Sequence, residues 1–287
     1  MAPQPLRQRR GQGRAAPERK RRARQPDRAP ERARPAADAF EVLYGTNPVR
    51  EALRAGRRTP RRLLLADGTR PDRALEEIVR LAQGQRCTVE THPRDDLGRL
   101  TRSYEHQGIV LVASPYPYAT LEEISAAVQQ AGPAALVLVL DRLQDPQNVG
   151  SLLRTAEAVG VQGIVLPERE AVAISPAVVR ASAGATEHLR IARVGNLVPA
   201  MAALQEAGLW VLGLEGDPQA DLYTAVDWER PLAVVVGSEG FGLRRLVRER
   251  CDGLVRLPMR GRIGSLNAAV AGSVVLYEIG RYRSQER

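Results

Sequence analysis

Polar and charged side chains that could take part in catalysis occur in three short stretches of the second half of the chain. The first stretch carries Asn148 and Arg154, the second carries Glu239 between glycines, and the third carries Ser265 and Asn267. A guanidinium stays protonated in proteins, so Arg154 could stabilise negative charge but could not act as a base. A carboxylate can accept a proton, while amides and hydroxyls can hold a substrate in place. These residue types suit general acid–base and electrostatic catalysis.

Taken separately, the first and third stretches also have a purely structural explanation. Asn148 suits the N-cap of a helix, and Arg154 could pair with Glu157 on the same helix face. Ser265 and Asn267 fall at a predicted helix start, where polar side chains satisfy unpaired N–H groups. Helix capping and a surface ion pair therefore compete with catalysis for each stretch alone.

The second stretch is a glycine-rich turn at residues 237–242. Glycines at 237, 240 and 242 allow positive φ angles and a close approach of the backbone to a ligand. Their G-x-x-G-x-G spacing differs from the dinucleotide fingerprint, and the phosphate-binding GxxxxGK[ST] pattern is absent from the sequence. An oxidoreductase that binds a dinucleotide is therefore disfavoured. Glu239 supports a functional turn, because turn geometry does not require a carboxylate there.

The elements that must position these stretches alternate between predicted strands and helices. Continuous apolar runs are typical of strands buried on both faces of a parallel sheet with helices on either side. Ligands of such sheets bind beyond the carboxyl ends of the strands, which is where the three stretches fall. The predicted strands cover residues 136–140, 164–166, 210–214, 233–236 and 254–257, and the predicted helices cover residues 149–159, 176–183, 197–207, 243–250 and about 266–282.

A smaller α/β unit precedes this sheet. Its predicted strands cover residues 42–44, 62–66, 87–90 and 109–113, and its predicted helices cover residues 47–53 and 75–82. The prolines at 115 and 117 predict a linker, to which a helix at residues 121–130 could belong. We therefore predict a tail at residues 1–38, a first unit at 39–115, a linker at 116–133 and a second unit at 134–287.

The basic character of the chain is concentrated in the tail. The whole chain carries a net charge of +9, of which residues 1–38 supply +8 through eleven arginines, one lysine and four acids. This segment has no apolar periodicity, so we expect it to be disordered. It could be an arm that attracts RNA phosphates, or a solvated tail without a specific role. Both interpretations stay open.

Composition excludes several classes of protein. Cys87 and Cys251 are isolated, which argues against a disulfide scaffold and a structural zinc site, and we expect no metal. No apolar run reaches about 18 residues, so we expect no membrane span. The N-terminus lacks the apolar segment of a secretory signal, and we expect a cytoplasmic protein.

The three stretches together resemble the three motifs of the SpoU (TrmH-type) RNA 2′-O-ribose methyltransferases of the SPOUT class. The resemblance extends from about Ala135 to the end of the chain and includes the Leu-Pro-Met that begins at Leu257. The first unit resembles the RNA substrate-binding domain of that family at residues 44–50 and 106–108. One departure is Ala269, where the family commonly has serine. Within the family, the likeness is greatest to bacterial enzymes that methylate a guanosine of 23S ribosomal RNA.

The resemblance implies a fold, a cofactor and an assembly. The fold would be a parallel α/β domain with a deep trefoil knot, which general topology rules disfavour and only the resemblance supports. The cofactor would be S-adenosyl-L-methionine, held mostly by backbone groups and without a charged side chain for its ribose. The enzyme would be a homodimer whose active site is shared between subunits. The alternative targets are a transfer RNA guanosine and a different 23S position.

The resemblance also implies roles for individual residues. Arg154 would clamp the target phosphate and stabilise developing oxyanion charge, while Glu239 would accept the proton or orient Arg154. Asn148, Ser265 and Asn267 would hold the ribose and the cofactor loops. The cofactor would contact Leu214, Gly216, Gly237, Gly242, Leu257, Met259 and Leu266. The alternative function from another class is that of a non-catalytic RNA-binding protein. That function would not explain the presence of Asn148, Arg154, Glu239 and Asn267.

Overall fold

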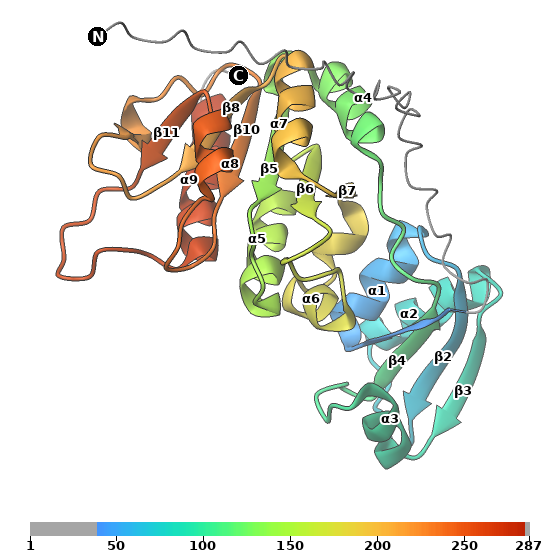
Figure 1. The fold of residues 1–287 in the computed structure, drawn as a ribbon. Coiled ribbons are helices and arrows are strands. Elements are labelled where there is room, and N and C mark those ends of the chain that lie inside the picture. The colour runs from blue at the N-terminus through green and yellow to red at the C-terminus, as the bar shows by residue number, and fades with distance from the viewer. Residues whose placement is uncertain (1–38, 285–287) are drawn as a thin grey trace, which may run out of the picture. The chain divides into compact units, whose positions relative to one another are not determined.

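Two β-sheets organise residues 39–284, the part of the chain that this computed structural model describes (Figure 1). The first sheet has four strands and the second has seven. The α/β class with a parallel sheet is thereby confirmed. The tail predicted for residues 1–38 lies outside the described residues. The trefoil knot stays a prediction of the resemblance, because strand order does not define how the chain is threaded.

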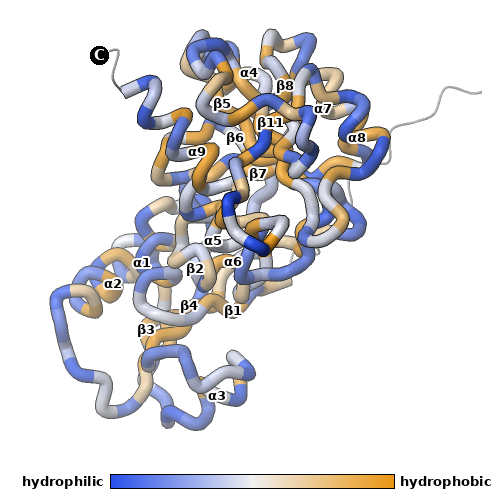
Figure 2. The backbone as a smooth tube through the Cα atoms, turned by 90° about the vertical axis from the view of Figure 1, so that its left-hand side faces the viewer, coloured by the Kyte–Doolittle hydropathy of each residue, from blue (hydrophilic) through white to orange (hydrophobic). Residues whose placement is uncertain are grey.

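The first sheet has the strand order β1-β4-β2-β3, with β4 antiparallel to both of its neighbours and β2 parallel to β3. Its strands are β1 (Glu41–Tyr44), β2 (Pro60–Ala66), β3 (Thr88–His92) and β4 (Ile109–Ala113), and its helices are α1 (Thr46–Ala55), α2 (Arg73–Gly84) and α3 (Arg94–Thr101). We did not predict α3, because its sequence is mostly polar and offers little apolar periodicity. Figure 2 shows this segment as largely hydrophilic.

All paired strands of the second sheet run parallel, in the order β7-β6-β5-β10-β8-β11-β9. They are β5 (Leu136–Leu140), β6 (Gly163–Pro167), β7 (Ile191–Val194), β8 (Trp210–Leu214), β9 (Asp221–Leu222), β10 (Leu232–Val236) and β11 (Gly253–Arg256). The five predicted strands are confirmed to within one or two residues. The two unpredicted strands, β7 and β9, lie at the sheet edges, where short and less apolar strands suffice.

Both faces of the parallel sheet are covered by helices, which explains its continuous apolar runs. Leu138 of β5 lies in one hydrophobic cluster with residues of α5 (Pro146–Ala158) and α9 (Ala268–Ser284). Its neighbour Val139 lies in another cluster with residues of α4 (Leu121–Ala131), α7 (Leu197–Glu206) and α8 (Arg245–Arg250). Alternate residues of one strand therefore point to opposite faces of the sheet. A further helix, α6 (Pro176–Ala181), packs on α5.

Helix α4 packs on the parallel sheet although its sequence position suggested part of a linker. A capping box at Thr120 and Glu123 starts it. Its buried residues Ile124 and Val128 join the cluster formed with β5, β6 and α7. None of the helices described for residues 39–284 is long and apolar enough to cross a membrane.

A buried ion pair joins the first unit to the short 3-10 helix Ala185–His188, which precedes β7. The Arg58 guanidinium donates to both carboxylate oxygens of Glu187, at 2.9 and 3.0 Å, and Nη1 donates to Glu41 at 2.6 Å. Arg58 is 3% exposed and Glu187 is fully buried. Burial lowers the pKa of Arg58, but the hydrogen bonds and charges of Glu187 and Glu41 outweigh it and raise that pKa overall.

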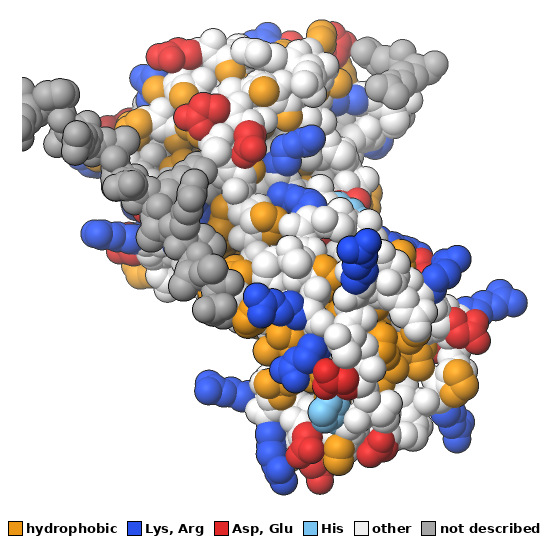
Figure 3. All heavy atoms as spheres, turned by 90° about the vertical axis from the view of Figure 1, so that its right-hand side faces the viewer, with side chains coloured by type: hydrophobic (Ala, Val, Ile, Leu, Met, Phe, Trp, Pro, Cys, Tyr) orange, Lys and Arg blue, Asp and Glu red, His pale blue; other side chains and the backbone are white. Residues whose placement is uncertain are grey.

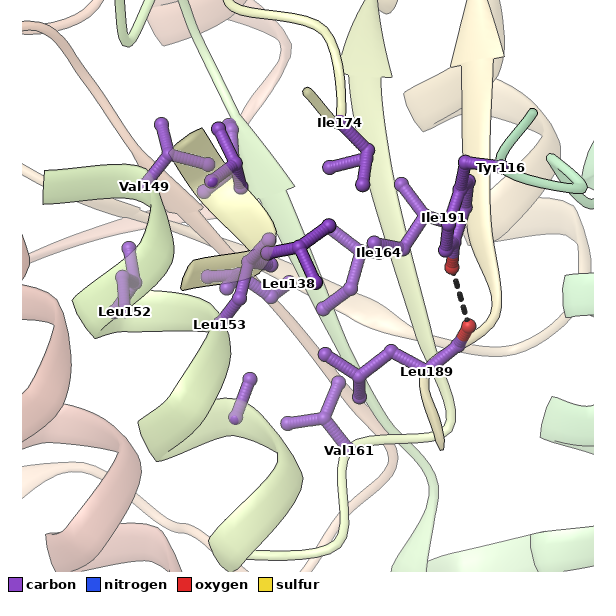
Figure 4. Packing of buried hydrophobic residues seen from close by; sticks show 14 of the residues in the cluster. Tyr116, Leu138, Val149, Leu152, Leu153, Val161, Ile164, Ile174, Leu189 and Ile191 are labelled. Carbon is purple, nitrogen blue, oxygen red and sulfur yellow. Dashed lines mark hydrogen bonds between the residues drawn. The ribbon is translucent and has the colours of Figure 1, made fainter. Parts of the chain in front are cut away.

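The segment between the two units is also fixed by its tyrosines. The Tyr116 hydroxyl donates to the Leu189 carbonyl at 2.7 Å, as Figure 4 shows among the surrounding apolar side chains. The Tyr118 hydroxyl accepts from the Ile174 amide at 2.8 Å. The guanidinium of Arg58 lies 5.3 Å from the centroid of the Tyr116 ring, within the range of a cation–π contact. The connection is therefore anchored along its length.

We predict that Arg58→Met lowers the free energy of unfolding by about 3–5 kcal/mol, because it leaves the Glu187 carboxylate buried without its partner. Arg99→Met is the matched control, since Arg99 is mostly exposed and pairs with Asp96 at the surface. Its loss should stay below about 1 kcal/mol. Urea unfolding followed by circular dichroism measures both variants. Equal losses in the two variants would contradict a structural role for the buried pair.

Candidate active site

The loops that follow β5, β8 and β10 leave the parallel sheet at the same level. Val236 at the end of β10 is in register with Leu140 of β5 and with Leu214 of β8. Strand β11 extends this edge beside β8. Because parallel strands present their carboxyl ends on one side, residues far apart in the sequence meet there.

Three of the predicted catalytic residues form a hydrogen-bonded network at this edge. The Asn148 Nδ2 donates to Glu239 Oε1 at 2.8 Å, and the Asn267 Nδ2 donates to Asn148 Oδ1 at 2.8 Å. The Asn267 amide also contacts Glu239 Oε1 directly. The network therefore links the first turn of α5, the glycine-rich turn after β10 and the residue that precedes α9. We refer to it as the amide–carboxylate network.

Asn267 caps a helix, whereas Asn148 does not. Helix α5 begins at Pro146 and is capped by Asp145, whose carboxylate accepts from the Gln147 amide at 3.1 Å. The predicted cap at Asn148 was therefore wrong, and its side chain is available for Glu239. Asn267 Oδ1 accepts from two amides at the start of α9, at 2.9 and 3.1 Å, so its predicted capping role is confirmed.

Arg154 does not join the network within one chain. It lies on the exposed surface of α5, six residues after Asn148, a rise of roughly 9 Å along the helix axis. The predicted ion pair with Glu157 is absent. Among residues 39–284, the Arg154 side chain has no hydrogen-bond or ion-pair partner. Its guanidinium is therefore available to a ligand or to another chain.

The turn at residues 237–242 is closed by its own backbone. The Gly242 amide donates to the Ser238 carbonyl at 3.0 Å, and the Ser238 amide donates to the Gly242 carbonyl at 3.2 Å. Gly242 has a φ of 62°, in the left-handed region. A Cβ at Gly237 would lie 2.4 Å from the backbone of Gly242. The turn itself therefore requires glycine at 237 and favours it at 242.

A cavity of about 240 Å³ lies beside this turn, between the loops that follow β8, β10 and β11. Glu239 and Ser265 form part of its wall. The wall also contains every residue that the sequence suggested for the cofactor, namely Leu214, Gly216, Gly237, Gly242, Leu257, Met259 and Leu266. We refer to this space, where the family resemblance would place the cofactor, as the cofactor pocket.

Two carboxylates near the pocket were not among the residues predicted from the sequence. Glu215 lines the cofactor pocket and accepts from the Leu243 amide at 3.3 Å, although no charged side chain was expected there. Asp141 is fully buried and accepts from the Arg244 amide at 2.9 Å and from its Nε at 2.7 Å. Both directly follow a buried strand, and that position was the signal that could have identified them.

The composition of the cofactor pocket suits S-adenosylmethionine. Leu214, Leu257 and Leu266 offer apolar contact for an aromatic base, and the glycines leave backbone groups accessible to polar atoms. Glu215 could accept hydrogen bonds from ribose hydroxyls or from an ammonium group. No residue in the described part of the chain belongs to a cluster of three or more His, Cys, Asp or Glu side chains that could bind a metal.

Comparison with known proteins identifies the family. Residues 135–277 match the model of the SpoU rRNA Methylase family, and residues 42–119 match that of the RNA 2′-O ribose methyltransferase substrate binding domain. A curated relative is the putative TrmH family tRNA/rRNA methyltransferase YacO of Bacillus subtilis. It is 40% identical over 244 residues, which cover 85% of this chain and 96% of the relative.

Solved structures agree with this match. The SpoU methyltransferase AviRb from Streptomyces viridochromogenes, in complex with the cofactor AdoMet, aligns with a TM-score of 0.70 and 27% identity over 86% of this chain and 91% of its own. An AdoMet-bound rRNA methyltransferase from Sinorhizobium meliloti aligns with a TM-score of 0.69 and 25% identity over 85% and 87% of the two chains. The chain belongs to the SpoU (TrmH) family of S-adenosylmethionine-dependent RNA 2′-O-ribose methyltransferases.

Proposed function

We propose that this enzyme methylates the ribose 2′-hydroxyl of a guanosine in 23S ribosomal RNA, in the cytoplasm and as a homodimer. The observation that supports the chemistry best is the contact between the cofactor pocket and the amide–carboxylate network, which share Glu239. The choice of 23S guanosine rests on the resemblance of the whole two-unit chain to enzymes with that target. A transfer RNA guanosine is the second candidate, because the relative YacO is named for both classes of RNA.

Methylation of a ribose hydroxyl requires a nucleophile that is positioned and relieved of its proton, since a neutral hydroxyl reacts slowly. S-adenosylmethionine supplies an electrophilic methyl group when it is bound. Glu239 Oε1 is held by the amides of Asn148 and Asn267, whereas its other oxygen has no partner among residues 39–284. We propose that this second oxygen accepts the hydroxyl proton. Ser265, on the pocket wall, would help to hold the ribose.

Arg154 would act across a dimer interface. The adjoining surface of α5 and α9 exposes Val270, Val274 and Tyr277, with 49%, 39% and 58% of their surfaces accessible. An apolar face of this kind is suited to contact with a second copy of the chain. In such a dimer, Arg154 of one subunit could reach the active site of the other, where it would clamp a phosphate and stabilise the oxyanion.

RNA recognition would fall mainly to the first unit. Figure 3 shows Arg side chains spread over one face of the molecule with Asp and Glu side chains between them. This distribution favours recognition by shape and by exposed bases over attraction to one uniformly basic patch. The first unit would therefore select the RNA, because the catalytic loops contact little more than the target nucleotide.

We predict that Arg154→Ala abolishes methyl transfer and leaves cofactor affinity nearly unchanged, because Arg154 lies outside the cofactor pocket. Transfer is measured with labelled S-adenosylmethionine and total RNA from a strain that lacks the gene, and affinity is measured by calorimetry. Arg245→Ala removes an exposed arginine of α8, outside the first unit and the cofactor pocket, and serves as the control for lost positive charge. Turnover of Arg154→Ala above a tenth of wild type would exclude an essential role.

We predict that Gly237→Ala weakens binding of S-adenosylmethionine at least about tenfold, because the new Cβ must displace the backbone of Gly242. Gly261→Ala is the matched control, since no atom lies within 4 Å of the Cβ that it adds. Calorimetric titration measures affinity, and thermal unfolding shows whether each variant is folded. Equal affinities of a folded Gly237→Ala and the wild type would show that the turn does not shape the pocket.

The target is tested by mapping 2′-O-methyl groups in ribosomal and transfer RNA from a strain with the gene deleted. We predict that one guanosine of 23S RNA loses its methyl group and regains it when the gene is restored. A strain restored with the Arg154→Ala variant should stay unmethylated at that position. Loss of a methyl group from transfer RNA instead would overturn the 23S proposal and leave the type of reaction intact.

A further inference from the structure

A second cavity adjoins the cofactor pocket on the other side of Ser238 and Glu239. Its volume is about 390 Å³, and Ser238 and Glu239 contribute to the walls of both spaces. The remaining wall is formed by the loop that follows β5 and by the tip of the glycine-rich turn. Its lining residues are Arg142, Leu143, Gln144, Asp145, Asn148, Ser238, Glu239 and Phe241. We refer to it as the second cavity.

The second cavity lies next to the side chain at which the methyl acceptor would react. Asn148 and Glu239, two members of the amide–carboxylate network, line it directly. A ribose hydroxyl that reacts at Glu239 must have the rest of its nucleotide next to this side chain. The cofactor pocket lies on one side of Glu239, and the second cavity is the other space that Glu239 lines. Its size and mixed polar and apolar wall suit a nucleobase.

Phe241 is the least expected residue of this wall. Its side chain is 92% exposed, although a phenyl ring gains stability from burial. It stands between Gly240 and Gly242, whose φ angles of 79° and 62° place it at the tip of the turn. Aromatic rings of RNA-binding proteins stack on unpaired bases, and such contacts tolerate any base because every base has a π face.

The opposite side of the second cavity is polar. Arg142 has a φ of 63°, unusual for a residue other than glycine, and its guanidinium pairs with Glu170 at 3.0 Å. Gln144 and Asp145 are exposed and follow it in the same loop. A base stacked on Phe241 would thus have hydrogen-bonding groups at its edge. These polar walls favour a nucleotide over a second copy of the chain, whose apolar contact surface is offered instead by α5 and α9.

We propose that the second cavity holds the base of the nucleotide that is methylated, and that Phe241 stacks on that base. The base enters the cavity from single-stranded or locally opened RNA, and its ribose then lies against Asn148 and Glu239. This inference rests on the proposed transfer to a ribose hydroxyl, but it does not depend on which RNA carries that ribose. Phe241 is therefore assigned as a substrate-binding residue.

The test compares Phe241→Ala, Phe241→Leu and Phe241→Tyr with the wild-type enzyme. Initial rates are measured at saturating labelled S-adenosylmethionine against increasing total RNA from the deletion strain. Phe241→Ala and Phe241→Leu should raise the apparent KM for RNA between about 5-fold and about 150-fold, because neither retains a π face. Phe241→Tyr should restore a value within about twofold of wild type, since tyrosine stacks on bases as well. Affinity for S-adenosylmethionine should be unchanged in all three.

Leu246→Ala is the matched control, because Leu246 is 56% exposed on α8 and lines neither cavity. Its kinetics should equal those of the wild type. A Phe241→Leu variant with wild-type KM would overturn the stacking role, since apolar bulk would then suffice. Dissociation of the dimer by Phe241→Ala, measured by ultracentrifugation, would overturn it in favour of a subunit contact.

The same assay separates this inference from the proposed function. An active wild type with an equally active Phe241→Ala variant would refute only the role of Phe241. Methylation of transfer RNA that depends on Phe241 would support the stacking role and refute only the 23S target. A wild-type enzyme that methylates no RNA would overturn the proposed function and this inference with it.

Discussion

The parallel pairing of β10 between β5 and β8 is the constraint on which the active site depends. Because the ladder is parallel and in register, Leu140, Val236 and Leu214 end their strands at one level. Parallel strands must be joined by crossovers, so the loops at this edge come from distant parts of the chain. The amide–carboxylate network can form only because these ends coincide. A slip of one residue would exchange the two apolar faces of β10 and separate the loops.

Carboxylates then hold the loops that the strand ends bring together. Asp141 bonds to the backbone and side chain of Arg244, and Glu215 bonds to the amide of Leu243. Both anchors fall just after the glycine-rich turn, whose own closure leaves no room for a side chain at Gly237. The turn is thus supported from the loops on either side. Its glycines form the cofactor pocket, and its tip presents Phe241 to the second cavity.

A second constraint joins the first unit to the segment that precedes β7. Arg58 and Glu187 are both buried. A displacement of the first unit would separate these two charges, which is unfavourable because each would lose its partner. Tyr116 adds a hydrogen bond to Leu189 beside them. The hydrophobic cluster that contains Tyr116 also extends from the first sheet into the parallel sheet. The two units therefore share a core, which suits an enzyme that must place one nucleotide of its RNA substrate accurately.

The sequence by itself determined the central strands, and the residues that it suggested for the cofactor line one cavity. Strands buried on both faces leave a continuous apolar signal, and the motifs after them occupy the one edge where a parallel sheet binds ligands. Tertiary structure alone decided the edge strands β7 and β9, the pairing of Arg58 with Glu187 across 129 residues, and the availability of Asn148 once Asp145 had capped α5. It also left Arg154 without the expected partner Glu157. The physical reason is that apolar periodicity depends on neighbours in the sequence, whereas the partner of a polar group is chosen by what the fold brings within hydrogen-bond distance.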